Sequence, residues 1–161
     1  MRRAAPRCRG CHRPVDTLSA ADRSRRMALI RGADTKPEMV VRRLAHRLGY
    51  RYRLHYKGLP GRPDLAFPGL RAVILIHGCF WHRHPDPACP LARLPKSRLD
   101  FWLPKLAGNR RRDEDIRACL MAMGWRVLTI WECELRDLDA VTARLLCFLG
   151  PRAGADGRPT C

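Results

Sequence analysis

The chain has 161 residues, 46% of them hydrophobic, which is enough for one domain with a core and too few for two. Lysine and arginine number 32 against 15 acidic residues, giving a formal net charge of +17. A folded chain this basic most often binds nucleic acid, although a proteome rich in arginine would raise the charge without any such function.

Neither a membrane span nor a secretory signal is visible in the sequence. The longest apolar run, residues 72–76, is only long enough for a strand, and no apolar stretch follows the basic start. We therefore expect a soluble, cytoplasmic protein. Residues 1–15 predict a flexible basic arm. The spacing of Cys8 and Cys11 in this arm indicates half of a zinc site or arises by chance. Residues 151–161 predict a loose tail, which leaves one folded domain over 16–150.

The folded region begins with two predicted helices. Ser19 can cap a short basic helix that ends at Gly32. Thr35 and Glu38 have the spacing of a capping box, which opens a second helix that runs to Leu48 and stops at Gly49.

Strands and helices then alternate along the rest of the chain. Residues 50–56 alternate like a strand, and 64–67 and 71–76 flank a Pro68-Gly69 turn and predict a hairpin. A helix over 113–123, a strand over 125–131 and a helix over 139–149 follow. This order predicts an α/β fold on a small mixed sheet.

The hairpin brings a carboxylate to a histidine-rich segment. Pairing of its two arms places Asp64 beside Ile76 and His77, because the first residue of one arm lies opposite the end of the other. A carboxylate at a sheet end can hold a hard cation such as Mg²⁺, although a turn or cap aspartate explains Asp64 equally well.

Residues 77–84 read His-Gly-Cys-Phe-Trp-His-Arg-His, a mixture of metal ligands and aromatics that indicates binding. Cys79, His84, Cys89 and Cys133 have the composition of a structural zinc site. The alternative is that these cysteines are buried thiols acting as small hydrophobes. Cys119 and Cys147 lie on apolar helical faces and are expected in the core.

Two aromatic pairs, Phe80-Trp81 and Phe101-Trp102, have basic neighbours, which suits stacking on bases. Strand alternation instead favours a core position for Trp125 and Trp131. Residues 109–112, Asn-Arg-Arg-Arg, precede the predicted helix and could hold phosphates, although a solvated charge run is the usual meaning of such a stretch.

Several motifs taken together resemble those of one family. They are Leu59-Pro-Gly-Arg-Pro-Asp64, His77-Gly-Cys-Phe-Trp-His82, Phe101-Trp102-Leu103, Gly124-Trp-Arg-Val-Leu and Trp131-Glu-Cys133. From about Asp16 to Leu149 the chain resembles the Vsr endonucleases of very short patch repair. The resemblance implies a restriction-endonuclease-like (PD-(D/E)XK-type) fold with a structural zinc. It also implies a Vsr-like endonuclease domain over 16–150 that nicks DNA 5′ of the T in T:G mismatches left by deamination of 5-methylcytosine.

The same resemblance assigns catalytic roles. Asp64 and the backbone carbonyl of Ile76 would hold Mg²⁺, His82 would act on the attacking water, and His77 would assist near the scissile phosphate. Glu38 would support the site through water or a histidine, and it keeps its capping role as well. The second acidic residue and lysine of ordinary restriction enzymes are absent after Asp64.

DNA contacts and zinc ligands also follow from the resemblance. Phe80, Trp81 and Trp102 would wedge into the base stack, with Met27 in the minor groove and Lys105 and Asn109 at the mismatched pair. A wedge costs least at a mismatch, where stacking is already weak. The zinc ligands would be Cys79, His84, Cys89 and Cys133. The stretch between His84 and Cys89 is longer than expected, so Asp86 is an alternative to Cys89.

The partners implied are duplex DNA with a T:G mismatch, a mismatch-repair protein and, through its product, a cytosine methyltransferase, with the enzyme itself a monomer. Two other functions fit the residues. One is a restriction-type endonuclease that cuts paired DNA at a fixed sequence. The other is a non-catalytic, zinc-stabilised DNA-binding protein.

Overall fold

The computed structural model describes residues 19, 21–22, 25, 28–29 and 32–151. The predicted arm over 1–15, Met27 and nearly all of the tail over 151–161 lie outside these residues. Within the described part of the chain, no helix is both long enough and apolar enough to cross a bilayer.

A four-stranded mixed sheet forms the centre of the molecule, in the order β1-β2-β3-β4. Its strands are β1 (Arg53–Leu54), β2 (Leu65–Phe67), β3 (Ala72–His77) and β4 (Arg126–Trp131). The first three are antiparallel neighbours, whereas β4 runs parallel to β3, with His77 opposite Trp131. The predicted small mixed sheet is therefore confirmed.

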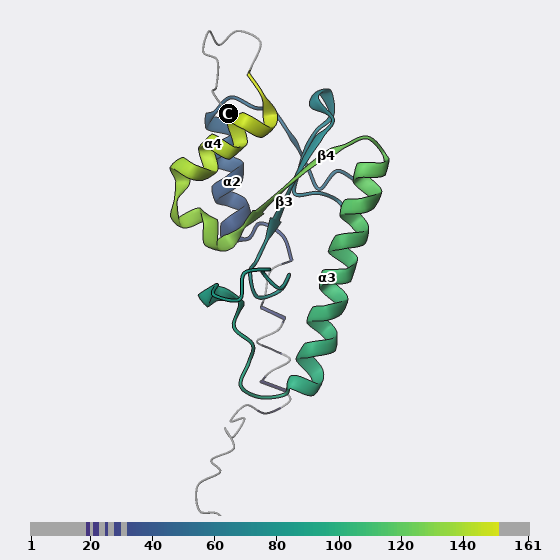
Figure 1. Cartoon of the computed structure of the whole chain (residues 1–161), viewed down its shortest axis with the longest axis vertical. Coiled ribbons are helices and arrows are strands. Elements are labelled where there is room, and N and C mark those ends of the chain that lie inside the picture. The colour runs from purple at the N-terminus through teal and green to yellow at the C-terminus, as the bar shows by residue number, and fades with distance from the viewer. Residues whose placement is uncertain (1–18, 20, 23–24, 26–27, 30–31, 152–161) are drawn as a thin grey trace, which may run out of the picture.

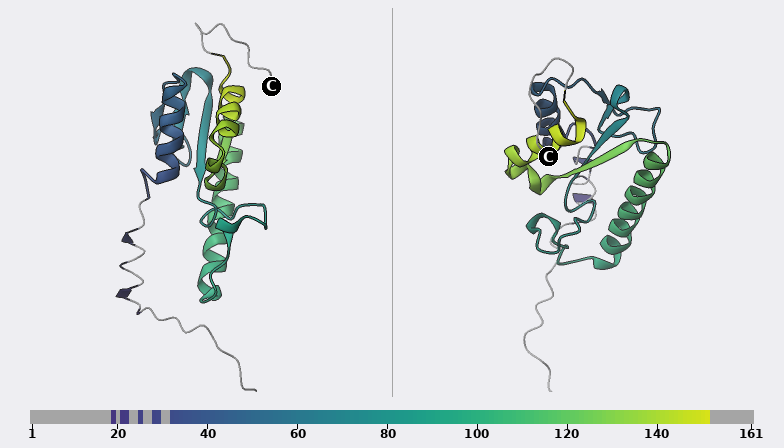
Figure 2. Two further views of the ribbon diagram at one scale, coloured as in Figure 1. Left: turned by 90° about the vertical axis from the view of Figure 1, so that its left-hand side faces the viewer. Right: turned by 45° about the horizontal axis from the view of Figure 1, so that its top comes forward.

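Helices cover both faces of this sheet (Figures 1 and 2). On one face lie α2 (Lys36–Arg47) and α4 (Leu138–Leu149), and on the other lies the long α3 (Leu99–Ala122). Short 3-10 turns η1 (Pro68–Leu70), η2 (Pro90–Ala92) and η3 (Glu132–Arg136) connect the elements. Because both of its faces are covered, every residue of β3 is buried, as its continuous apolar run predicts.

Local chemistry explains where these elements begin. Thr35 caps α2, as predicted, because its hydroxyl accepts from the amide of Glu38 (3.5 Å). The Glu38 carboxylate returns to the Thr35 hydroxyl (2.8 Å) and the Asp34 amide (3.0 Å), and not to the Thr35 amide that a full capping box uses. The Ser19 hydroxyl accepts from the amide of Asp22 (3.0 Å), as predicted for a cap. The hairpin of β2 and β3 turns through η1 at the predicted Pro68-Gly69.

Two predicted elements have different bounds in the structure. The strand over 50–56 shrinks to β1, whose two residues are both exposed. The helix predicted to begin at about Asp113 begins at Leu99 and includes Pro104. The predicted start is therefore wrong, because the segment 99–112 is helical too and α3 continues across Pro104. Residues 109–112 therefore lie within α3 and do not precede it.

Three residues predicted in the core lie elsewhere. Cys119 and Cys147 are exposed on α3 and α4, because the buried faces of these helices carry Leu120 and Leu145 instead. Trp131 is half-buried, and its ring contacts two histidines edge-on. Trp125 does pack, partly buried, against the apolar cluster under α3.

Candidate active site

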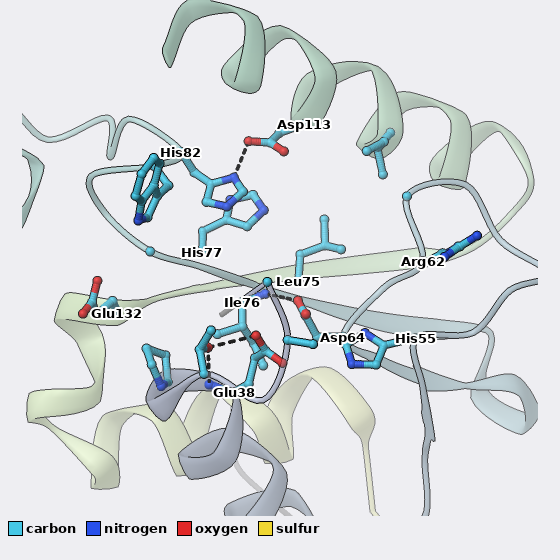
Figure 3. A pocket seen from close by; sticks show the side chains of 18 residues that line it. Glu38, His55, Arg62, Asp64, Leu75, Ile76, His77, His82, Asp113 and Glu132 are labelled. Carbon is cyan, nitrogen blue, oxygen red and sulfur yellow. Dashed lines mark hydrogen bonds and ion pairs between the residues drawn. The ribbon is translucent and has the colours of Figure 1, made fainter. Parts of the chain in front are cut away.

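A pocket of about 830 Å³ opens where the N-terminus of α2, the end of β3 and the middle of α3 meet (Figure 3). Four predicted catalytic residues line this pocket: Glu38, Asp64, His77 and His82. The fold thus brings together side chains that come from separate elements.

Asp64 lies just before β2, where the hairpin directs it toward β3. The amide of Ile76 donates a hydrogen bond to Asp64 Oδ2 (2.7 Å), which confirms the predicted juxtaposition. Burial raises the pKa of Asp64 to about 6, with nearby Glu38 adding to the rise, whereas the Ile76 hydrogen bond, His55 and Arg42 oppose it. The surroundings of Asp64 therefore favour its protonated, uncharged form over the carboxylate.

His77 and His82 stack face to face, with ring centroids 4.1 Å apart and planes inclined by 9°. His82 Nδ1 lies 2.6 Å from Asp113 Oδ2 on α3. Since an ionised carboxylate only accepts, Nδ1 carries the proton and Nε2 of a neutral His82 keeps its lone pair. Burial, followed by the charge of His82, lowers the pKa of His77 to about 4, so His77 is neutral at pH 7.

A third group centres on Arg42, which is 5% exposed. Its guanidinium donates to the carboxylates of Asp34 and Glu38, the latter at 2.8 Å, and lies 3.1 Å from His55 Nε2. Glu38 accepts from Thr35 and the Asp34 amide as well, so both of its carboxylate oxygens are engaged. Glu38 is thus held at the pocket wall by capping and ionic contacts at once.

The predicted zinc ligands converge beside this pocket. One sulfur atom from each of Cys79, Cys89 and Cys133 lies within 4.8 Å of the others, and His84 Nε2 is 3.5 Å from Cys133 Sγ. Asp86 instead lies in an exposed turn, where its carboxylate accepts from the amide of Ala88 (2.8 Å). Burial raises the pKa of the Cys79 thiol to about 12.

The predicted DNA-contacting aromatics form one cluster. The ring of Phe80 lies 5.0 Å from that of Trp81 and 5.4 Å from that of Trp102, centroid to centroid. The ammonium of Lys105 lies 5.9 Å from the centre of the Trp102 ring, and Asn109 donates to the carbonyl of Trp81 (3.1 Å). Asn109 therefore links α3 to the loop that carries the aromatics.

Sequence reasoning missed Asp113, Arg42 and His55. Asp113 was overlooked because the helix was predicted to begin there, which hid the fact that Asn109, Asp113 and Ile116 share one helical face. Extending the predicted helix back from Asp113 to Asn109 would have revealed this face. His55 was not predicted as a site residue, because the predicted strand ran over 50–56 and placed His55 inside it. In the structure β1 ends at Leu54, and His55 follows the strand.

A mixed α/β domain with a buried carboxylate and a histidine–aspartate pair in one pocket, in a strongly basic chain, is suited to hydrolysis of nucleic-acid phosphodiesters. Residues 15–87 match the family model described as DNA mismatch endonuclease Vsr. The chain belongs to this family and is a Vsr-type nicking endonuclease of mismatch repair.

Three relatives align with this chain over most of their lengths. The Type II nicking enzyme V.XorIIP of Xanthomonas oryzae pv. oryzae is 52% identical over 137 residues, which cover 85% of this chain and 98% of the relative. The DNA mismatch endonuclease Vsr of Escherichia coli is 40% identical over 132 residues, which cover 82% and 83% respectively. The Type II nicking enzyme V.NmeAIP of Neisseria meningitidis is 38% identical over 131 residues, which cover 81% and 91%.

Proposed function

We propose that the enzyme recognises T:G mismatches and hydrolyses the phosphodiester 5′ of the mismatched T in a reaction that depends on Mg²⁺. The observation that carries this proposal is the convergence of Asp64, His77 and His82 on one pocket. A nick at this bond, with a 5′-phosphate and a 3′-hydroxyl, would start the replacement of a short patch.

The oxygen donors at the end of β3 suit a hard cation. Asp64 and the backbone carbonyl of Ile76 would hold Mg²⁺, which prefers carboxylate, carbonyl and phosphate oxygens. When bound, the ion would supply charge stabilisation and a more acidic water. It would also favour ionised Asp64, offsetting the burial that raises the pKa of this side chain.

His82 is proposed as the general base. Its Nδ1–H is held by Asp113, so Nε2 is free to take the proton of the attacking water. His77, neutral and stacked on His82, would steady the ring and face the scissile phosphate. Glu38 would act from the pocket wall through Arg42 and His55, because its own oxygens are already engaged.

Choice of the mismatch is proposed to lie with the aromatic cluster of Phe80, Trp81 and Trp102. Stacking on an aromatic ring contributes about 1–3 kcal/mol per base, and insertion costs least where pairing is already weak. Trp102→Ala should therefore weaken binding of a T:G duplex about tenfold or more, with a smaller loss on paired DNA. Equal losses on both duplexes would refute the assignment. Met27, Lys105 and Asn109 are proposed to contact the DNA near the mismatch.

A zinc ion is proposed at Cys79, His84, Cys89 and Cys133, since three clustered thiols and an imidazole match the donor set of structural zinc. The ion would take thiolates in place of thiols and brace the loop between His77 and α3. Binding through His84 Nε2 would move the ring proton to Nδ1 and release the Asp86 amide that now donates there.

Strand-resolved cleavage of duplexes with T:G or T:A at one position tests the whole proposal. We expect a nick only in the T strand of T:G duplexes, only with Mg²⁺, and none with Asp64→Asn. Cleavage of the paired duplex at a fixed sequence would favour a restriction-type enzyme. Binding without product under any divalent metal would favour a non-catalytic DNA-binding protein. A panel of T:G duplexes with different flanking bases would define the sequence context that the enzyme recognises, and hence the methyltransferase whose products it repairs. A mismatch-repair protein partner can be sought by adding such proteins to the same assay.

A further inference from the structure

The wall of the pocket away from the histidine pair carries two basic side chains, of which the proposed mechanism uses His55 only as a link to Glu38 and does not use Arg62. His55 and Arg62 line this wall; Asp64 lies between His55 and the stacked His77 and His82, and Leu75 lies between Arg62 and that pair (Figure 3). Both have left-handed backbones, with φ of 43° for His55 and 49° for Arg62. Residues other than glycine rarely adopt this conformation, so the backbone is held in an uncommon geometry at both places.

His55 is fixed in one protonation pattern by Arg42. A guanidinium has only donors, so the contact of 3.1 Å to Arg42 requires that His55 Nε2 accept the hydrogen bond. The proton of the neutral imidazole is then on Nδ1. Asp34, Glu38 and His55 are close enough together to hold a metal ion, but the Arg42 guanidinium already supplies the cation among them. Arg42 thus fixes the His55 imidazole with its Nδ1–H as a donor, for which the described part of the chain shows no hydrogen-bond acceptor.

The backbone around Arg62 is tightly packed, whereas its guanidinium has no ion pair among the described residues. Gly61 has φ of 70°, and a Cβ at this position would lie only 2.5 Å from Ile116 Cγ2, so the turn is packed tightly against α3. Pro63, on the other side, is fully buried. The Arg62 side chain itself is exposed and forms no ion pair with any residue that the structure describes.

We propose that Arg62 and His55 form a second phosphate-binding subsite, which holds the phosphodiester next to the scissile one on the nicked strand. This inference rests on the proposed function. A guanidinium binds phosphate oxygens through two charge-assisted hydrogen bonds, and the N–H donor of His55 on the same pocket wall would add a third. Holding the neighbouring phosphate would set the position of the scissile bond relative to Asp64 and His82.

Methylphosphonates test this contact, because they replace one charged phosphate oxygen by a methyl group. A T:G duplex would carry one such linkage on either side of the scissile phosphate, and binding would be measured in chelator so that no strand is cut. For the wild type, one of the two linkages should weaken binding about tenfold or more. For Arg62→Ala, this linkage should cost much less than in the wild type, because only the His55 contact with it remains. The exposed Arg43→Ala on α2 is the matched control and should keep the wild-type penalty.

Substitutions at His55 separate the phosphate contact from the contact with Arg42. Asn keeps a donor at the position of Nδ1, whereas Gln keeps an acceptor at the position of Nε2. His55→Asn should retain most of the position-specific penalty, while His55→Gln and His55→Ala should reduce it. Retention by Gln but not by Asn would show that His55 only supports Arg42 and would overturn its place in the subsite.

Equal penalties in Arg62→Ala and the wild type would overturn the subsite as a whole, as would the absence of any penalty at both linkages in the wild type. These failures are distinguishable from failure of the proposed function. The wild type is assayed in parallel for Mg²⁺-dependent nicking of the unmodified T:G duplex, and that result does not depend on either arginine variant.

Discussion

The carboxylate of Asp113 lies 2.6 Å from Nδ1 of His82, a residue 31 positions earlier in the sequence. This contact joins the middle of α3 to the loop that leaves β3. It orients the imidazole and sets its tautomer, so the basic nitrogen of His82 depends on a helix that contributes no other carboxylate to the pocket.

Asp113→Asn should lower kcat by about 10²–10⁴-fold, the usual contribution of a correctly protonated general base. The amide can donate to Nδ1 and so favour the wrong tautomer of His82. Single-turnover nicking with saturating enzyme measures the chemical step. Binding of the T:G duplex should be unchanged, and Asp115→Asn, exposed on the same helix, should behave as the wild type. A loss confined to binding would contradict the role of Asp113 as a positioning residue.

Asp64→Asn should stabilise the metal-free protein while it abolishes nicking. The folded-state pKa of about 6 exceeds the ordinary value of 3.8, so protonation of Asp64 stabilises the fold at low pH, and this stabilisation is lost as the pH rises through 6. The advantage of the variant should thus be absent near pH 4 and reach about 1–3 kcal/mol above pH 6. Urea unfolding in chelator at several pH values measures it. A constant difference at all pH values would exclude titration of Asp64 as its cause.

Cys89→Ser should lose zinc, whereas Asp86→Asn should keep it. The thiol of Cys89 faces those of Cys79 and Cys133, while Asp86 lies in an exposed turn. Zinc content by mass spectrometry of the purified variants decides between them, and thermal unfolding should show a lower Tm for the serine variant alone. Loss of zinc from Asp86→Asn would return Asp86 to the ligand set.

Gly61→Ala should destabilise the fold by about 1–4 kcal/mol, the sum of a left-handed backbone and an overpacked contact. The added Cβ would lie 2.5 Å from Ile116 Cγ2. Combining it with Ile116→Ala should relieve the clash but leave the backbone penalty, which a double-mutant cycle in urea resolves. Gly69→Ala is the matched control, since nothing lies near its added Cβ. Equal effects at both glycines would contradict the packing argument.

The sequence predicted the approach of Asp64 to Ile76 because hairpin register is local information: a short turn fixes which residues face each other. The grouping of Cys79, His84, Cys89 and Cys133, the proposed zinc ligands, was likewise predicted from residue type, and the structure adds that Cys89, and not Asp86, lies with the other two thiols. In both cases the chemistry of the side chains restricted the geometry.

The contribution of α3 was not predictable in the same way. The sequence predicted a helix only from about Asp113, with the charged residues 109–112 before it. In the structure Leu120 packs with Ala66 and Val73 of the sheet, and Leu106 is buried as well, so tertiary burial supports the longer helix. Asp113 therefore reached the pocket through a tertiary contact that no local pattern revealed. Trp131 was misplaced for a related reason: alternation along β4 predicts a buried ring but does not reveal that His77 and His84 cover it.

Side chains alternate along β3, so Ile74 and Ile76 pack toward α2 and α4, whereas Val73 and His77 face α3. Because of this alternation, insertions should be tolerated in some segments of the enzyme and not in others. Residues 85–88 are exposed, so an added residue there leaves the register of β3 unchanged. One residue inserted within β3 would carry His77 to the opposite face, away from Asp113 and toward the apolar side. We therefore expect natural length variation to be confined to such loops, and the spacing from Ala72 to His82 to be invariant among active enzymes.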